Sequence, residues 1–295
     1  MFKKIILSTT IVSVLFSLCA CSSNSVNTTS SSKITVVASF NAMSEFVKAI
    51  GKDKVNVVTV IPNGTDPHDF EPKIKDLQDL TDAKLFVYNG LGLEKWANSA
   101  ISSVGNKNLI AVDASKGYPA NKVSNSGEYD PHIWLSITGA EAEAKNIEAG
   151  LEKADPSNKT YYEANYTSFY NELNALYNEY KPKFSSVKNK NFVTGHAAFG
   201  YLCKDFNLTQ DSVEDVFADG EPSAQKMDEL INTCKKENIK TVFVEDMVSP
   251  KVSETLAKEV GASVKKIYTE ESKEDNLDYI QAMKANLKEI YDSMK

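Results

Sequence analysis

The fold is decided in residues 34–61, which read ITVVASFNAMSEFVKAIGKDKVNVVTVI. The β-branched apolar run from Ile34 to Ser39 predicts a buried strand, and the segment from Met43 to Ile50 has the apolar spacing of a helix. A second buried strand is predicted from Val55 to Ile61. A strand, a helix and a strand in this order predict a βαβ unit, in which the two strands lie parallel in one sheet.

The same alternation fills the chain on both sides of one exceptional segment, residues 155–188. Within it the aromatic and leucine residues recur at steps of four and three, which predicts one long helix with a single packing face: Tyr162, Tyr166, Phe169, Leu173, Leu176 and Tyr180. Pro182 is expected to end or kink this helix. We therefore predict an α/β protein with two lobes, 33–154 and 189–295, each a mainly parallel sheet flanked by helices, joined by one long rigid helix over 155–188.

The N-terminus predicts export. Two lysines and then an apolar run from Ile5 to Ala20 have the pattern of a signal peptide over residues 1–20, too short for a membrane span. Cys21 follows a small residue, as in the lipobox of bacterial lipoproteins, so we expect it to be lipidated; a plain secretory signal is the alternative. Residues 21–32 are almost all Ser, Asn and Thr and predict a flexible tether.

The charge balance favours cations as partners. Removing residues 1–20 takes away two lysines and leaves 31 lysines against 40 acids, a net charge of about −9. The chain contains no arginine, so no bidentate guanidinium clamp for phosphate or carboxylate can form. This composition argues against nucleic acid as a partner. Cys203 and Cys234 lack CxxC spacing, and their redox state stays open.

All three histidines lie in proline- or glycine-framed turns. Two occupy the same tripeptide, Asp66-Pro67-His68 and Asp130-Pro131-His132, and the third follows a glycine in Gly195-His196-Ala197. Proline fixes the backbone before each of the first two imidazoles. His68, His196 and Glu271 also follow predicted strands, where open α/β sheets bind their ligands. The three histidines are therefore predicted to converge on one site.

These motifs carry a resemblance that runs from about residue 33 to the C-terminus. They comprise the two Asp-Pro-His turns, Asn89-Gly90-Leu91-Gly92-Leu93-Glu94, Gly195-His196-Ala197-Ala198-Phe199-Gly200-Tyr201, Gly220-Glu221-Pro222-Ser223 and Tyr268-Thr269-Glu270-Glu271-Ser272. In order, spacing and chemistry the chain resembles the zinc/manganese-binding lipoproteins of bacterial ABC importers, of the adhesin-lipoprotein type. One departure is plain: zinc members often carry a histidine-rich loop before the second ligand, and residues 117–130 contain no histidine.

The resemblance implies a single metal between the lobes, held by His68, His132, His196 and Glu271. Imidazoles with a carboxylate suit a divalent transition metal, and this nitrogen-rich set favours Zn2+ over Mn2+. The alternative for Glu271 is that it is a solvent-exposed surface acid with no role in metal binding. Glu245, after another apolar strand, is either the competing carboxylate or the partner that orients an imidazole.

The implied function is the extracytoplasmic metal-binding component of an ABC importer. It would capture a divalent metal, deliver it to a membrane permease, and act as a monomer lipid-anchored to the bacterial cell membrane. A manganese-specific protein of the same type, or a surface adhesin with a structural metal, is the alternative. A metallohydrolase is disfavoured, because four protein ligands leave no open position for water and the chain has no HExxH motif.

Overall fold

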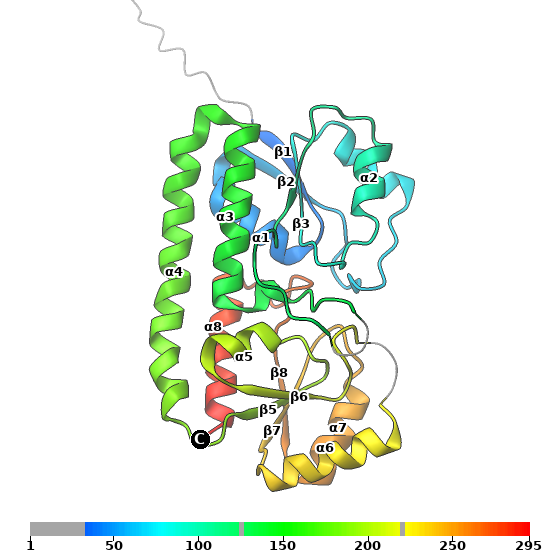
Figure 1. Ribbon diagram of the computed structural model, residues 1–295, viewed down its shortest axis with the longest axis vertical. Coiled ribbons are helices and arrows are strands. Elements are labelled where there is room, and N and C mark those ends of the chain that lie inside the picture. Colours follow the sequence, from blue (N-terminus) through cyan, green and yellow to red (C-terminus); the bar gives the residue numbers. More distant parts are fainter. Residues whose placement is uncertain (1–32, 124–126, 219–221) are drawn as a thin grey trace, which may run out of the picture. The chain divides into compact units, whose positions relative to one another are not determined.

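The computed structural model describes residues 33–123, 127–218 and 222–295 (Figure 1). The predicted signal peptide, the tether and Cys21 lie outside the described residues. Within the described part of the chain, no helix is both long and apolar enough to cross a membrane.

The N-terminal lobe is built on a four-stranded parallel sheet in the order β2-β1-β3-β4. Its strands are β1 (Ile34–Ala38), β2 (Val55–Thr59), β3 (Leu85–Tyr88) and β4 (Ile110–Asp113). Three helices belong to the same lobe: α1 (Asn41–Gly51), the short α2 (Ala97–Ser103) and α3 (Ile137–Ala154). Helix α1 packs on β1 and β2 and α3 packs on β3 and β4, which explains why these strands read as continuous apolar runs.

The C-terminal lobe repeats this plan with the order β6-β5-β7-β8, again all parallel. Its strands are β5 (Asn191–Thr194), β6 (Thr209–Ser212), β7 (Thr241–Val244) and β8 (Ser263–Lys266). Its helices are α5 (Gly200–Phe206), α6 (Ala224–Lys236), α7 (Pro250–Val260) and α8 (Tyr279–Ser293). The two sheets confirm the predicted α/β architecture. The polar strand β6 carries no apolar run, so periodicity does not reveal it.

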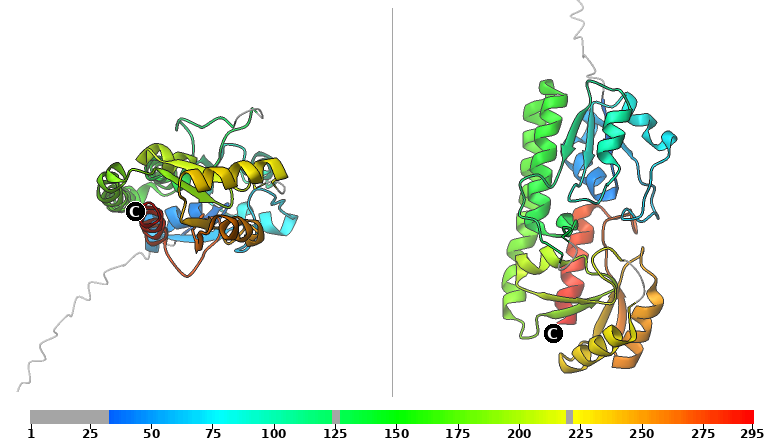
Figure 2. Two further views of the ribbon diagram at one scale, coloured as in Figure 1. Left: turned by 90° about the horizontal axis from the view of Figure 1, so that it is seen from below. Right: turned by 45° about the vertical axis from the view of Figure 1, so that its right-hand side comes forward.

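Helix α4 (Lys159–Ser186) joins the lobes. It contacts α1 and α3 in the first lobe and α5 and α8 in the second, and it runs along both sheets (Figure 1). Helix α8, drawn red, lies beside it in both views of Figure 2. Pro182 does not end the helix, which continues to Ser186, so the expectation that the helix ends at this proline is wrong. The reason is that Pro182 is exposed, while Phe184, two residues later and on the opposite face of the helix, is fully buried and packs against aromatic side chains.

Candidate metal centre

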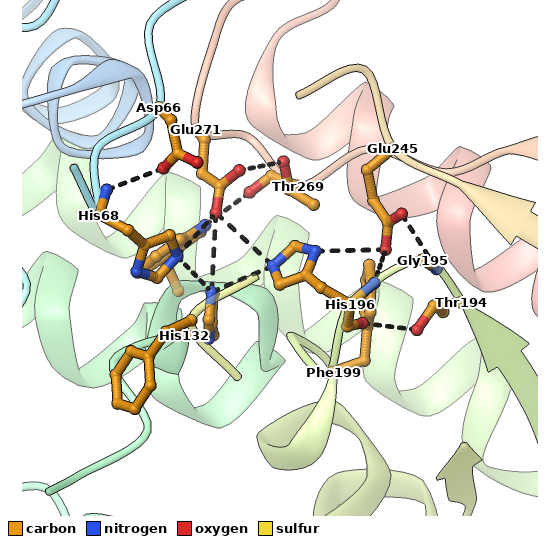
Figure 3. Close-up of polar contacts among 12 residues, drawn as sticks. Asp66, His68, His132, Thr194, Gly195, His196, Phe199, Glu245, Thr269 and Glu271 are labelled. Atoms are coloured by element: carbon orange, nitrogen blue, oxygen red, sulfur yellow. Dashed lines mark hydrogen bonds and ion pairs between the residues drawn. The ribbon is translucent and has the colours of Figure 1, made fainter. Parts of the chain in front are cut away.

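Each predicted metal ligand lies just beyond the carboxyl end of a strand or in the loop that follows one. His68 follows β2, and His132 follows the long connection after β4. His196 lies two residues beyond β5, and Glu271 five residues beyond β8. Figure 3 shows these four side chains pointing toward one another. The structure therefore brings together all four residues, although they come from both lobes.

The ligand atoms of the four side chains all lie within 4.8 Å of one another. The Nε2 atom of His132 is 3.2 Å from that of His68 and 3.4 Å from that of His196. Oε1 of Glu271 is 3.6 Å from both His68 Nε2 and His132 Nε2, and 3.9 Å from His196 Nε2. Ligands about 2.0–2.1 Å from a tetrahedral zinc ion stand roughly 3.4 Å apart. These five separations, 3.2–3.9 Å, lie near this value, so a small inward movement of the donors would complete such a shell.

His132 is oriented by the aspartate two residues before it. Asp130 Oδ1 accepts from the backbone N–H of His132 at 3.0 Å and lies 2.9 Å from its Nδ1. The carboxylate places the ring proton on Nδ1, so Nε2 presents a bare lone pair to the centre. Burial opposes protonation of this ring, but its contacts with Asp130 and Glu271 outweigh burial, and the pKa of His132 is raised.

Glu245 performs the corresponding task for His196 (Figure 3). Its carboxylate lies 3.4 Å from His196 Nδ1, on the side of the ring opposite Nε2, and accepts from the backbone N–H groups of Gly195 at 3.1 Å and His196 at 3.2 Å. Burial again opposes protonation, but Glu245 outweighs it and the pKa of His196 is raised. A Cβ at position 195 would lie 2.1 Å from Glu245 Oε2, which explains the glycine there. Of the two roles that the sequence leaves open to Glu245, the geometry matches that of the orienting partner.

Glu271 supplies the only carboxylate oxygen among the four ligand atoms. The hydroxyl of Thr269 donates to its Oε2 at 2.9 Å, while Oε1 has no hydrogen-bond partner among the described residues. The side chain is almost fully buried, at 4% exposure for the residue. Burial opposes ionisation, yet contacts with His132, His68 and His196 outweigh it, so the pKa of Glu271 is held well below its usual range.

His68 lies at the mouth of the site. Its backbone N–H donates to Oδ1 of Asp66 at 2.8 Å, which closes the first Asp-Pro-His turn. Its ring meets that of Phe217 edge to face, with 6.2 Å between centroids. A cavity of about 470 Å3 borders both residues and is lined further by Asp69, Leu93 and Lys95. Of the four cluster residues, His68 is therefore the one that lines this cavity.

The donor set calls for a cation at its middle. When both rings carry their proton on Nδ1, the atom that faces Asp130 in His132 and Glu245 in His196, their Nε2 lone pairs face each other across 3.4 Å. The ionised Glu271 adds a third acceptor facing them. Acceptors this close repel unless a positive charge lies between them. A divalent ion removes this repulsion and leaves each donor coordinated.

Sequence reasoning named the four converging side chains and Glu245 but gave no role to Asp130, Asp66 or Thr269. The repeated Asp-Pro-His tripeptide was the available signal, because an aspartate two residues before a backbone N–H commonly closes a turn on it. Nothing in the local sequence marks Thr269 as a partner of Glu271.

Comparison with known proteins agrees with this geometry. Residues 36–293 match the model of the family described as zinc-uptake complex component A, periplasmic. The high-affinity zinc uptake system protein ZnuA of Bacillus subtilis (strain 168) is 38% identical over 315 residues, covering 100% of this chain and 99% of the relative.

Two solved structures share the fold. A crystal structure of ZnuA has 32% identity and a TM-score of 0.81, covering 89% of this chain and 100% of the other. The laminin-binding protein Lmb of Streptococcus agalactiae, titled a bifunctional protein with adhesin and metal transporting activity, has 35% identity, a TM-score of 0.83 and the same coverage. The family match spans nearly all of the described residues, and the chain therefore belongs to the periplasmic zinc-uptake component A family of solute-binding transport proteins.

Proposed function

We propose that this protein captures a zinc ion outside the cytoplasm, holds it between its two lobes with His68, His132, His196 and Glu271, and delivers it to an ABC permease. The observation that carries the proposal is the convergence of three imidazole Nε2 atoms and one carboxylate oxygen within 4.8 Å. Zinc is the cargo. The family match and the zinc uptake named for the Bacillus relative support the same assignment.

Binding rather than catalysis suits this donor set. Four protein ligands complete a tetrahedral shell and leave no position at which the metal could activate water. Burial also separates the ion from bulk solvent, since His132, His196 and Glu271 are each at most 4% exposed. The protein is therefore a carrier, which binds the metal ion and later releases it unchanged.

Metal analysis tests the cargo directly. Protein purified without chelator should contain close to one zinc per chain, and competition titration should show tighter binding of zinc than of manganese. The same protein incubated with generic ester, peptide and phosphate substrates should show no turnover. A metal content near zero after incubation with excess zinc would remove the basis of the proposal.

The anchor is the second part of the proposal. We infer from the lipobox-like sequence that Cys21 is lipidated and that residues 21–32 tether a monomeric carrier to the outer face of the cell membrane. Cys21→Ala should leave the protein uncleaved or shed into the medium, because the polar tether offers no other membrane affinity. Cys203→Ala, which removes a buried thiol instead, is the matched control. Detergent-phase partitioning distinguishes them, and unchanged partitioning of Cys21→Ala would exclude the anchor.

A further inference from the structure

The turn that carries Glu271 belongs to the C-terminal lobe by sequence but is bonded to the N-terminal lobe. It follows β8, yet the indole N–H of Trp134 donates to Thr269 O at 2.7 Å. The backbone N–H of Gly64 donates to the Ser272 hydroxyl at 2.8 Å. Both donors belong to the first lobe: Gly64 lies in the loop after β2, and Trp134 lies in the short 3-10 helix Ile133–Leu135. The loop that presents the metal carboxylate is thus held from the opposite lobe.

Asn41 makes the densest of these contacts. It is the first residue of α1, 6% exposed, and its side-chain N–H2 group lies 3.1 Å from Glu270 Oε2, 3.3 Å from Glu270 O and 3.3 Å from Ser272 O. These acceptors flank Glu271 on both sides along the chain. One amide therefore fixes the backbone immediately before and after the ligand.

The backbone at Glu270 explains why such support is needed. This residue has φ = +58°, a left-handed conformation that costs a non-glycine residue free energy of order 1 kcal/mol. The conformation reverses the chain so that Glu270 points toward Asn41 while Glu271 points toward the histidines. The bond from Asn41 to the Glu270 carboxylate therefore supports the conformation that directs Glu271 to the histidines.

His196 is supported quite differently. Its partner Glu245 follows β7, and both residues extend from the C-terminal sheet. By contrast, His68 and His132 come from the N-terminal lobe, and Glu271 is bonded to it through its neighbours. By sequence, two of the four cluster residues belong to each lobe. By the contacts that hold them in place, three depend on the N-terminal lobe and only His196 depends on the C-terminal lobe alone.

We propose that Asn41 is a positioning residue for Glu271, holding the Thr269–Ser272 turn against the N-terminal lobe so that the carboxylate faces His68 and His132. This inference rests on the proposed function, because it needs Glu271 to be a zinc ligand. Asn41 does not contact the ion. Its effect must therefore reach zinc only through Glu271.

A double-mutant cycle tests this dependence. Asn41→Ala should weaken zinc binding about tenfold, the usual scale for residues that orient a ligand, with faster zinc release to a chelator. In the Glu271→Ala background the same substitution should cause no further loss, because there is no carboxylate left to position. Ser272→Ala removes a separate bond to the same turn and should show the same dependence, so the test survives if Asn41→Ala folds poorly.

The control is Asn106→Ala. Asn106 also donates from its side chain to two backbone carbonyls of the N-terminal lobe, those of Leu80 and Ala83, and it is absent from the metal cluster. It should lower thermal stability and leave zinc affinity unchanged. Equal zinc affinity for Asn41→Ala and wild type, or an equal tenfold loss in both backgrounds, overturns the positioning role alone. Wild-type affinity in Glu271→Ala overturns the ligand assignment and the positioning role together.

Discussion

At the scale of single residues, the centre depends on carboxylates that act on histidines rather than on the ion. Asp130 and Glu245 each face the Nδ1 atom of one ring and so direct its Nε2 inward. Such partners hold the ring angle and raise the basicity of the ligand nitrogen. The coordination chemistry of this site is thus set by two acids that lie behind the imidazoles.

The identity of residue 196 should control metal preference. His196→Ala should weaken zinc binding by at least about 100-fold, since it deletes a ligand rather than its support. His196→Glu should improve manganese relative to zinc, because manganese prefers oxygen ligands. Competition titration of both metals on wild type and the two variants measures this. Manganese outcompeting zinc on the wild type would show that the ligand set is misassigned.

Glu143, on α3, is a buried acid outside the metal centre. It is fully enclosed, and neither carboxylate oxygen has a hydrogen-bond partner among the described residues. Burial, followed by repulsion from Glu94 and Asp113, raises its pKa well above the usual value. Because the folded state holds this proton more tightly than the unfolded chain, its contribution to stability falls as pH rises above about 4.5.

Glu143→Gln should therefore stabilise the protein at pH 7.5, by about 1 kcal/mol or more, because the buried site no longer has a group to ionise. The gain should shrink as pH falls to and below about 4.5, where the glutamate becomes protonated in the unfolded chain as well as in the folded state. Urea unfolding of both proteins at the two pH values measures the difference. Exposed Glu254→Gln on α7 is the control and should change little. A variant less stable than wild type at pH 7.5 would contradict the argument.

At the scale of elements, α4 tolerates a proline because packing outweighs the lost backbone bond. The ring of Phe184 packs against those of Phe206 and Tyr291, with centroids 5.1 and 5.9 Å apart, and this anchors the last turn. Pro182 faces solvent, where water can satisfy the carbonyl that its missing N–H leaves unpaired. The last turn of the helix is consequently stabilised more by side-chain packing than by its backbone hydrogen bonds.

Pro182→Ala should raise the free energy of unfolding by about 2–3 kcal/mol. A proline inside a helix costs about 3 kcal/mol, of which up to about 1 kcal/mol is returned because it restricts the unfolded chain. Zinc affinity should not change, since α4 supplies none of the residues of the metal cluster. Chemical unfolding of metal-free protein checks the value, with exposed Lys181→Ala as control. A loss of stability in the Pro182→Ala variant would contradict this argument.

At the scale of the whole molecule, the proposed zinc site is built from groups that lie far apart in the sequence. Contacts between His132 and each of the other two histidines span 64 positions in sequence, and Glu271 lies beyond them in the last lobe. A ligand that binds only the folded arrangement stabilises it by mass action. Zinc is therefore expected to act as a clamp on the folded pair of lobes.

This clamp should be acid-labile. The raised pKa values of His132 and His196 mean that their ion pairs stabilise metal-free protein below pH about 6.5 and lose that effect as pH rises through the folded values. Zinc needs both rings deprotonated, so protons compete with it as pH falls. The melting temperature should rise by several degrees with zinc at pH 7.5 and far less at pH 5, and magnesium should shift neither. Equal zinc-induced shifts of the melting temperature at the two pH values would contradict the predicted competition between zinc and protons.

The sequence by itself determined the alternation of strands and helices, the long connecting helix and the four candidate ligands. These depend on local signals: apolar periodicity, an aromatic stripe, and histidines framed by proline or glycine. Each signal is complete within a few residues. Such patterns can be read from the sequence without knowing how distant parts of the chain pack.

Only the tertiary structure decided how the acids are used. Glu270 and Glu271 are adjacent and chemically identical, and the left-handed backbone at Glu270, bonded to Asn41, determines which one faces the histidines. Likewise, Glu245 became a partner of His196 because β5 and β7 are neighbours in the sheet. Both outcomes depend on hydrogen bonds between residues 49 to 229 positions apart, which local sequence cannot encode because packing of distant elements creates them.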